Sequence, residues 1–149
     1  MLLLTKCETG WMGVGVIARD HKGTVLAMFC ATKRYVQDPT MAEAVAAWEA
    51  MELAQRLDLR RFILEGDALE IVQMLRQEGG CGTIYGQLLN DVKEQLRRWQ
   101  GWEIQHISRR GNSVAHHLTK LALEQDGNIE WRDGFPSSIL DLAFSESSL

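Results

Sequence analysis

The chain has 149 residues, of which 46% are hydrophobic and 24% are charged, and its net charge at pH 7 is −4. This length and composition indicate one globular domain with a buried core. The negative charge argues against a generally basic nucleic-acid binder, although residues 97–120 hold five basic side chains, one acidic side chain and three of the four histidines. A local basic surface of this kind is compatible with nucleic-acid contacts.

Three widely spaced cysteines, Cys7, Cys30 and Cys81, show no zinc-binding spacing. Their odd number and wide separation favour a reducing compartment, so we expect an intracellular protein, cytoplasmic or nuclear, and not a secreted one. The apolar start of the chain ends at Thr5 and Lys6, too early for a signal peptide. No run of residues reaches the length of a membrane span, and we expect no membrane partner.

A β-hairpin is the first element that the sequence predicts clearly. Residues 10–18 alternate glycines with apolar residues and indicate a strand under close backbone packing. Residues 20–23 have turn composition, and residues 24–31 form the return strand. Gly13 and Gly15 precede a strand and not a helix, so a dinucleotide-binding fingerprint is rejected.

The first helix follows the hairpin. The sequence from Thr40 to Glu43 matches a capping box, and helical spacing continues to about Leu57. Small alanines along one face of this helix would let it lie close to a sheet. This arrangement places Glu43 on the sheet-facing side of the first turn, where its role as a cap is already a sufficient explanation.

Asp67 stands where a strand changes into a helix. Phe62, Ile63 and Leu64 form a short apolar run, and helical spacing begins directly after Asp67. Local sequence favours an Asp67 that caps the next helix, with Glu70 three residues later. Ligands of open α/β sheets bind at the carboxyl ends of strands, so a functional role depends on the rest of the chain.

The second half of the chain continues the alternation. Ile84 begins a helix that ends near Trp99, and a strand follows over residues 102–107. Asn112 is predicted to cap the last helix after a turn. The domain is therefore expected over residues 1–125. Residues 126–149 are expected to form an irregular, acidic C-terminal tail that packs on the domain or trails from it, with four residues as its anchors: Trp131, Phe135, Pro136 and Ile139.

A hairpin followed by alternating elements predicts an α/β fold, with a mixed sheet of antiparallel and parallel strands and helices on its faces. In this order, the motif around Gly13–Gly15, the residues around Glu43 and Asp67, and the segment 106–118 resemble the type 1 ribonuclease H family, a ribonuclease H-like fold. More narrowly they resemble the plant reverse-transcriptase-like RNase H domains. The resemblance covers nearly the whole chain.

The resemblance implies a site of four carboxylates around two magnesium ions, which hydrolyse the RNA strand of an RNA–DNA hybrid. Glu43 and Asp67 match two of the four acids and would be the metal ligands. The family's first aspartate should lie before Gly10, where only residues 2–4, all leucine, resemble a strand. We therefore expect a truncated or replaced first strand. The fourth acid of the family falls at His116.

His116 lies one helical turn after Asn112, so both face the expected site. Imidazole is a poor ligand for magnesium, and a surface role for His116 stays open. With two of four acids missing, we expect weak or absent magnesium binding. The resemblance assigns nucleic-acid contacts to four residues, for which a solvated basic face is the alternative: Arg109, Arg110, Asn112 and Lys120.

Three functions stay open at this stage. The first is a domain that binds RNA–DNA hybrid or other nucleic acid with weak or lost cleavage. The second is an active ribonuclease H, a hydrolase with a truncated N-terminal strand. The third is a non-enzymatic interaction or scaffold module, and a generic regulatory α/β domain is a distant fourth. We expect a monomer.

Overall fold

The computed structural model describes residues 2–8, 11–34, 39–77, 79, 86–99, 101–125 and 127–147, with the backbone alone at 2–8, 39–40, 109 and 146–147. Its elements follow one another along the chain in this order: β1 (Leu2–Glu8), β2 (Trp11–Arg19), β3 (Val25–Arg34), α1 (Pro39–Arg56), β4 (Arg61–Gly66), α2 (Leu69–Arg76), α3 (Gly86–Leu96), β5 (Gly101–His106), the 3-10 turn η1 (Arg109–Asn112), α4 (Ser113–Gln125), β6 (Ile129–Trp131) and α5 (Ser137–Ser147).

The strands of the described residues form one mixed sheet in the order β5-β4-β1-β2-β3-β6. β1 pairs antiparallel with β2, and β2 pairs antiparallel with β3. β4 runs parallel to both of its neighbours, β1 and β5. The predicted combination of a hairpin and parallel strands is confirmed, and β4 is the second strand from one edge, between β5 and β1.

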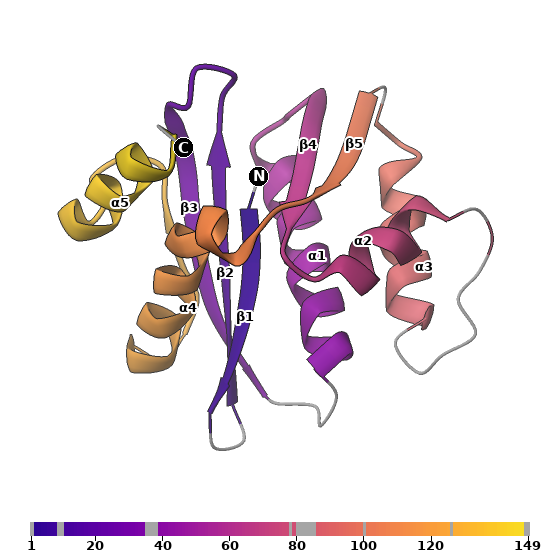
Figure 1. Ribbon diagram of the computed structural model, residues 1–149, viewed down its shortest axis with the longest axis horizontal. Coiled ribbons are helices and arrows are strands. Elements are labelled where there is room, and N and C mark those ends of the chain that lie inside the picture. Colours follow the sequence, from indigo (N-terminus) through magenta and orange to yellow (C-terminus); the bar gives the residue numbers. More distant parts are fainter. Residues whose placement is uncertain are drawn as a thin grey trace.

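Two apolar cores lie on opposite faces of the sheet (Figure 1). α1, α2 and α3 cover one face, where the alanines of α1 pack against β2, β3 and β4. α4 and α5 cover the other face, around Ile17, Met28 and Leu118. No helix within the described ranges is long and apolar enough to cross a membrane.

The glycines of β2 allow α4 to lie directly on the sheet. A Cβ atom at Gly15 would clash with the carbonyl oxygen of Ala115 and lie 2.8 Å from the Cβ of Leu118. A Cβ atom at Gly13 would clash in the same way with the carbonyl oxygen of Thr119. The prediction of close backbone packing at these glycines is confirmed, and α4 is the element that makes the approach.

The opening strand is longer than the sequence indicated. β1 spans Leu2–Glu8, whereas only residues 2–4 were expected to be strand. It pairs with β2 over its whole length, from Leu2 opposite Ile17 to Glu8 opposite Trp11. Polar residues in its second half, Thr5 and Lys6, concealed the strand, because a central strand is expected to be continuously apolar.

The segment after Gln125 is not irregular, and that prediction is wrong. β6 pairs antiparallel with β3 and adds an outer strand to the sheet. α5 packs against the core of α4, with Ile139 and Ala143 buried. Trp131 and Phe135 pack against the same core, as their anchoring role required.

Candidate functional site

Asp67 directly follows β4, at the carboxyl end of an inner parallel strand. It does not occupy the N-cap position of α2, which belongs to Ala68, and the side chain of Ala68 makes no capping hydrogen bond. The local prediction that Asp67 caps the helix is therefore wrong by one residue. Asp67 is half-buried and lies at the strand end where open α/β sheets bind ligands.

The turn that carries Asp67 is attached to β5. The Nε2 atom of His106 lies 3.2 Å from the carbonyl oxygen of Asp67, and because that oxygen only accepts, the ring nitrogen must donate. The amide of Ile107 donates to the carbonyl of Gly66 over 3.0 Å. Arg76 of α2 donates from Nε to the carbonyl of Ile104 over 2.8 Å. These bonds hold the turn on both sides of Asp67.

His106 is the residue that sequence reasoning missed. It begins the segment 106–118 that carried the family resemblance, but no role was assigned to it. His106 is the last residue of β5, which runs parallel to β4. It pairs with Gly66, the residue directly before Asp67. Parallel strands bring their carboxyl ends to one edge, so a polar side chain at each end is a signal that can be read from sequence.

Glu43 lies in the second turn of α1, because the helix begins at Pro39, one residue ahead of the predicted cap at Thr40. Its side chain is half-buried, and its Oε2 atom is inaccessible to solvent. The buried neighbours Ala42 and Ala44 confirm that this part of α1 packs against the sheet. α1 contacts β1 and β2, so Glu43 approaches the centre of the sheet from the face opposite α4.

The residues predicted at the last helix differ in burial. Asn112, at the end of η1, is fully buried. On α4, His116 is half-buried and Lys120, four residues later on the same side of the helix, is exposed. Burial argues against a direct contact of the Asn112 side chain with a nucleic acid. Ser108 caps η1, where its hydroxyl accepts from the amide of Gly111.

Arg110 is exposed on η1, and only the backbone of Arg109 is described. η1 contacts β1 and α4, so its residues lie beside the centre of the sheet. The imidazole ring of His116 lies 6.3 Å from that of His117 in an edge-to-face arrangement. His117 donates from Nδ1 to the carbonyl of Ser113 over 2.9 Å and is thereby bound to its own helix.

The register of β1 shows which of its residues lie beside the end of β4. Leu2 lies opposite Glu65 and Leu3 lies opposite Gly66, the residue directly before Asp67. Between Leu2 and Cys7 the chain contains no carboxylate. β1 contacts α1, α4, η1 and β4, which are the elements that carry or adjoin every predicted site residue. This part of β1 therefore brings leucines, and no carboxylate, to the end of β4 that precedes Asp67.

The carboxylates and histidines do not form a metal cluster. Within the described part of the chain, no three side chains of histidine, cysteine, aspartate or glutamate come close enough to hold one ion. Magnesium requires several hard oxygen ligands in near-octahedral geometry. The residues present therefore do not fit the complete two-metal site that the resemblance implied.

Comparison with known proteins gives one family and one fold. Residues 4–122 match the family model described as reverse transcriptase-like. RNase H1 from the archaeon Halobacterium salinarum superposes with a TM-score of 0.76 at 21% identity, over 83% of this chain and 95% of that one. LC11-RNase H1, from a compost metagenome and in complex with an RNA/DNA hybrid, gives 0.72 at 20% identity over 83% and 95%.

A third structure extends the same likeness to another organism. The N-terminal RNase H domain of a Mycobacterium tuberculosis protein gives a TM-score of 0.66 at 18% identity, covering 83% of this chain and 92% of that domain. No match was found among curated protein sequences. Because the sequence identities are this low, these structures establish the fold alone.

Proposed function

The chain belongs to the reverse transcriptase-like family of RNase H domains, and from this membership we propose that it binds RNA–DNA hybrid with weak or lost cleavage. One observation supports the second half of the proposal. From Leu2 to Cys7, β1 contains no carboxylate, although the family resemblance calls for an aspartate on the opening strand. A second acid of the family is replaced by His116 on α4.

The remaining acids support weak magnesium binding at most. Glu43 and Asp67 come from α1 and from the end of β4, and their two carboxylates offer about half of the charge that the family's two ions would require. Magnesium gives up its water molecules reluctantly, so two carboxylates do not offset the cost of dehydration. When bound, the ions would supply an activated water and stabilise the leaving oxygen.

Binding to nucleic acid depends on basic side chains, and this chain has exposed ones near His116. Arg110 and Lys120 are exposed on neighbouring elements, η1 and α4, beside the half-buried His116. Exposed cations contact phosphates and set the salt dependence of affinity without reading the sequence. The hybrid in complex with LC11-RNase H1, a protein of the same fold, supports hybrid as the ligand to test first.

The test measures binding and cleavage in the same samples. Fluorescence anisotropy of a labelled hybrid at low salt reports affinity, and denaturing gels report cleavage with magnesium and with manganese. We expect salt-sensitive binding in every sample and at most traces of product. Glu43→Gln and Asp67→Asn serve as variants that should leave binding in place and remove any trace cleavage.

Two outcomes would replace the proposal. Robust cleavage in magnesium that Asp67→Asn abolishes would identify an active ribonuclease H, with His116 and solvent completing the site. Absence of binding at low salt by a folded protein would favour the scaffold module, for which the negative net charge of −4 is the supporting feature.

A further inference from the structure

A pocket of about 340 Å³ lies at the amino ends of β4 and β5, lined from residues 55–60 at the end of α1 and from residues 95–99 at the end of α3. We call it the amino-end pocket. Parallel strands start at the same edge of a sheet, so the two segments that lead into β4 and β5 meet there (Figure 1). Asp67 follows the opposite end of β4, about 20 Å away at about 3.3 Å per residue. The pocket is therefore separate from the candidate site around Asp67.

Trp99 forms an apolar wall of the amino-end pocket and is held from two directions. Its indole Nε1–H donates to the carbonyl of Leu59, which lines the pocket from the other segment. Its ring also packs edge-to-face on Phe62 of β4, with 5.3 Å between the ring centroids and 88° between the ring planes. These contacts join the two segments, so the pocket is formed by the fold itself. A ligand that enters a preformed pocket loses less free energy to ordering of the protein.

Two arginines line the amino-end pocket, Arg60 and Arg98, whereas their neighbours in sequence do not. Arg97 forms an ion pair with the glutamate three residues before it, over 2.7 Å. Arg61 lies along β5, 3.1 Å from a Cβ atom placed on Gly101. Within the described part of the chain, the guanidinium groups of Arg60 and Arg98 form no ion pair and no hydrogen bond. Both are exposed to a ligand, and guanidinium groups bind phosphate oxygens through paired N–H donors.

Asp58 brings a carboxylate to the same pocket from a strained backbone position. Its φ is 53°, in the left-handed region that favours glycine. The amide of Asp58 donates to the carbonyl of Gln55 and the amide of Leu59 to that of Ala54, both over 3.1 Å, which are the bonds of a glycine-type helix end. The described arginines form no ion pair with Asp58. Its carboxylate can therefore accept from hydroxyl groups of a ligand, and strain kept at a pocket is a signal of function.

We propose that the amino-end pocket binds a nucleoside 5′-monophosphate. The phosphate binds to Arg60 and Arg98, the sugar hydroxyls donate to Asp58, and the planar base packs against Trp99. A nucleotide is the ligand class that combines an anion, hydroxyl donors and a flat apolar group. The pocket volume lies at the lower end of the roughly 300–1,000 Å³ of small-molecule sites, so it has room for one nucleotide. This binding is independent of the hybrid.

Titration of the isotope-labelled, full-length chain with adenosine monophosphate tests the proposal. The indole N–H signal of Trp99 reports on the pocket, because this group donates to Leu59 in the opposite wall. We expect a saturable change with a dissociation constant below about 1 mM. Adenosine lacks the phosphate and inorganic phosphate lacks the nucleoside, so each should bind at least about tenfold more weakly.

Three arginine variants separate the pocket from general attraction of anions. Arg60→Gln and Arg98→Gln should each weaken binding of adenosine monophosphate at least about fivefold. Arg97→Gln is the matched control, because it removes a neighbouring exposed arginine outside the pocket and should leave the affinity unchanged. All three side chains are exposed, so the variants should fold.

Asp58→Gly separates ligand binding from stability. Glycine adopts the positive φ without strain, so the urea midpoint of unfolding should rise. Loss of the carboxylate should nevertheless weaken binding of adenosine monophosphate at least about threefold. Weaker binding in a more stable protein has no explanation in misfolding, whereas unchanged affinity would contradict the role of Asp58 in the pocket.

Four further results would overturn the proposal. The first is the absence of a saturable change at Trp99 in millimolar adenosine monophosphate. The second is a loss of affinity in Arg97→Gln equal to that in Arg60→Gln, which would indicate attraction of any anion. The third is inorganic phosphate binding as tightly as the nucleotide. The fourth is tighter binding of a 5′-phosphorylated tetranucleotide than of adenosine monophosphate, which would assign the pocket to a nucleic-acid strand.

Discussion

The backbone of Gly15 lies against the carbonyl group of Ala115, so close that no side chain fits between β2 and α4 at this point. Ala115 directly precedes His116, and Gly15 pairs with Leu4 of β1. The contact therefore fixes how closely α4, directly before His116, lies on the β2 residue that pairs with Leu4. The glycine is explained by packing and needs no ligand.

Replacing Gly15 by alanine should destabilise the protein by roughly 1–3 kcal/mol, because the added methyl group forces α4 away from β2. Urea unfolding followed by circular dichroism measures the change. Gly111→Ala is the control, since a Cβ atom there would meet only the hydroxyl of Ser108, at 3.8 Å. A Gly15→Ala protein as stable as the control would contradict the close packing of α4.

Glu130 should make the stability of the protein depend on pH. Its carboxylate accepts from Arg56 over 2.8 Å and from Arg132 over 3.0 Å, joining β6 to α1. Burial by itself raises the pKa of Glu130, but the hydrogen bonds from Arg132 and Arg56 prevail and the pKa is lowered below its ordinary value of 4.5. The carboxylate form is therefore favoured by folding, and the stabilisation is present above pH 4.5.

As the pH falls through the lowered pKa, the folded protein must take up a proton on Glu130 and this stabilisation is lost. The difference in stability between the unmodified protein and Glu130→Gln should be positive at about pH 6 and should shrink toward about pH 3. Thermal unfolding across this range measures it. A difference that stays constant with pH would mean that the negative charge of Glu130 does not strengthen its hydrogen bonds from Arg56 and Arg132 in the folded protein.

Cys30 should resist thiol reagents in the folded protein. It is buried on β3 opposite Ile129 of β6, and burial raises the pKa of its thiol to about 11. Thiolate is the reactive form, so little is present at neutral pH. In a protein with Cys7→Ser and Cys81→Ser, labelling should become fast only in step with global unfolding by urea. Fast labelling without denaturant would mean that β6 and α4 open readily over this position.

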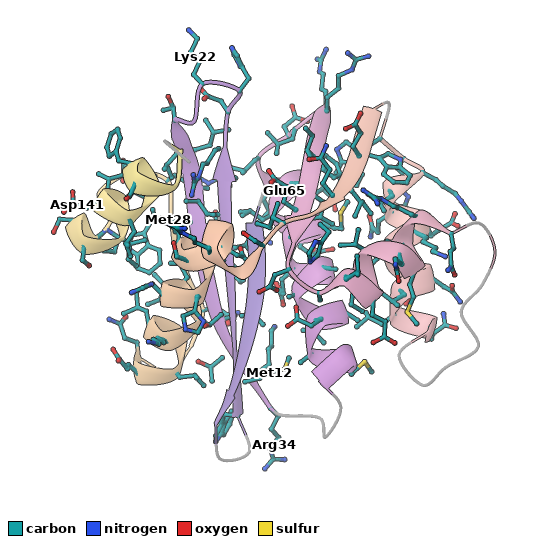
Figure 2. All side chains as sticks on the ribbon, in the orientation of Figure 1. Met12, Lys22, Met28, Arg34, Glu65 and Asp141 are labelled. Atoms are coloured by element: carbon teal, nitrogen blue, oxygen red, sulfur yellow. The ribbon has the colours of Figure 1, made fainter. Side chains whose placement is uncertain are left out.

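Hybrid affinity should fall steeply with salt, and Arg110 and Lys120 should contribute to that slope. Alanine at both positions should weaken binding to hybrids of different sequence alike. The slope of log affinity against log salt should flatten by about one for each phosphate contact removed. Lys22→Ala is the control for the loss of a cation on another element, because Lys22 lies in the turn between β2 and β3 (Figure 2). An unchanged slope in the double variant would place the nucleic-acid surface elsewhere.

Restoring the missing acids should restore cleavage if ligand loss is what removed it. His116→Asp places an oxygen ligand on α4, and Leu4→Asp places one on β1, directly after the residue that pairs with Gly66. Neither alone should suffice, because residues that act as a unit in a two-metal site are non-additive. The doubly substituted protein should cleave the RNA strand in magnesium, and Asp67→Asn should then abolish the activity. A folded but inactive double variant would favour the scaffold module.

The alternation of strands and helices was readable from sequence because it follows local periodicity. The capping box at Thr40 and the apolar run before Asp67 marked element boundaries to within a few residues. The position of Asp67 relative to α2 was not readable, since the N-cap is one residue later, at Ala68, and the turn is bound to His106 of β5. That attachment joins Asp67 to His106, which is distant in sequence, and no local pattern contains it.

β6 was missed for a related physical reason. Ile129–Trp131 is three residues long, too short for a period to be recognised, and its strand geometry comes from pairing with β3. The second half of β1 was missed because Thr5 and Lys6 are polar, although its pairing with β2 makes it strand.

The two outer edges of the sheet affect how the protein behaves at high concentration. β6 covers only Met28, Phe29 and Cys30 of β3, and the uncovered end of β3 carries Lys33 and Arg34. The opposite edge strand, β5, is short, and most of its side chains are exposed and polar. Short strands and charges at an edge oppose pairing between molecules. Growth of the sheet from molecule to molecule at its rim, the first step of fibril formation, is therefore disfavoured.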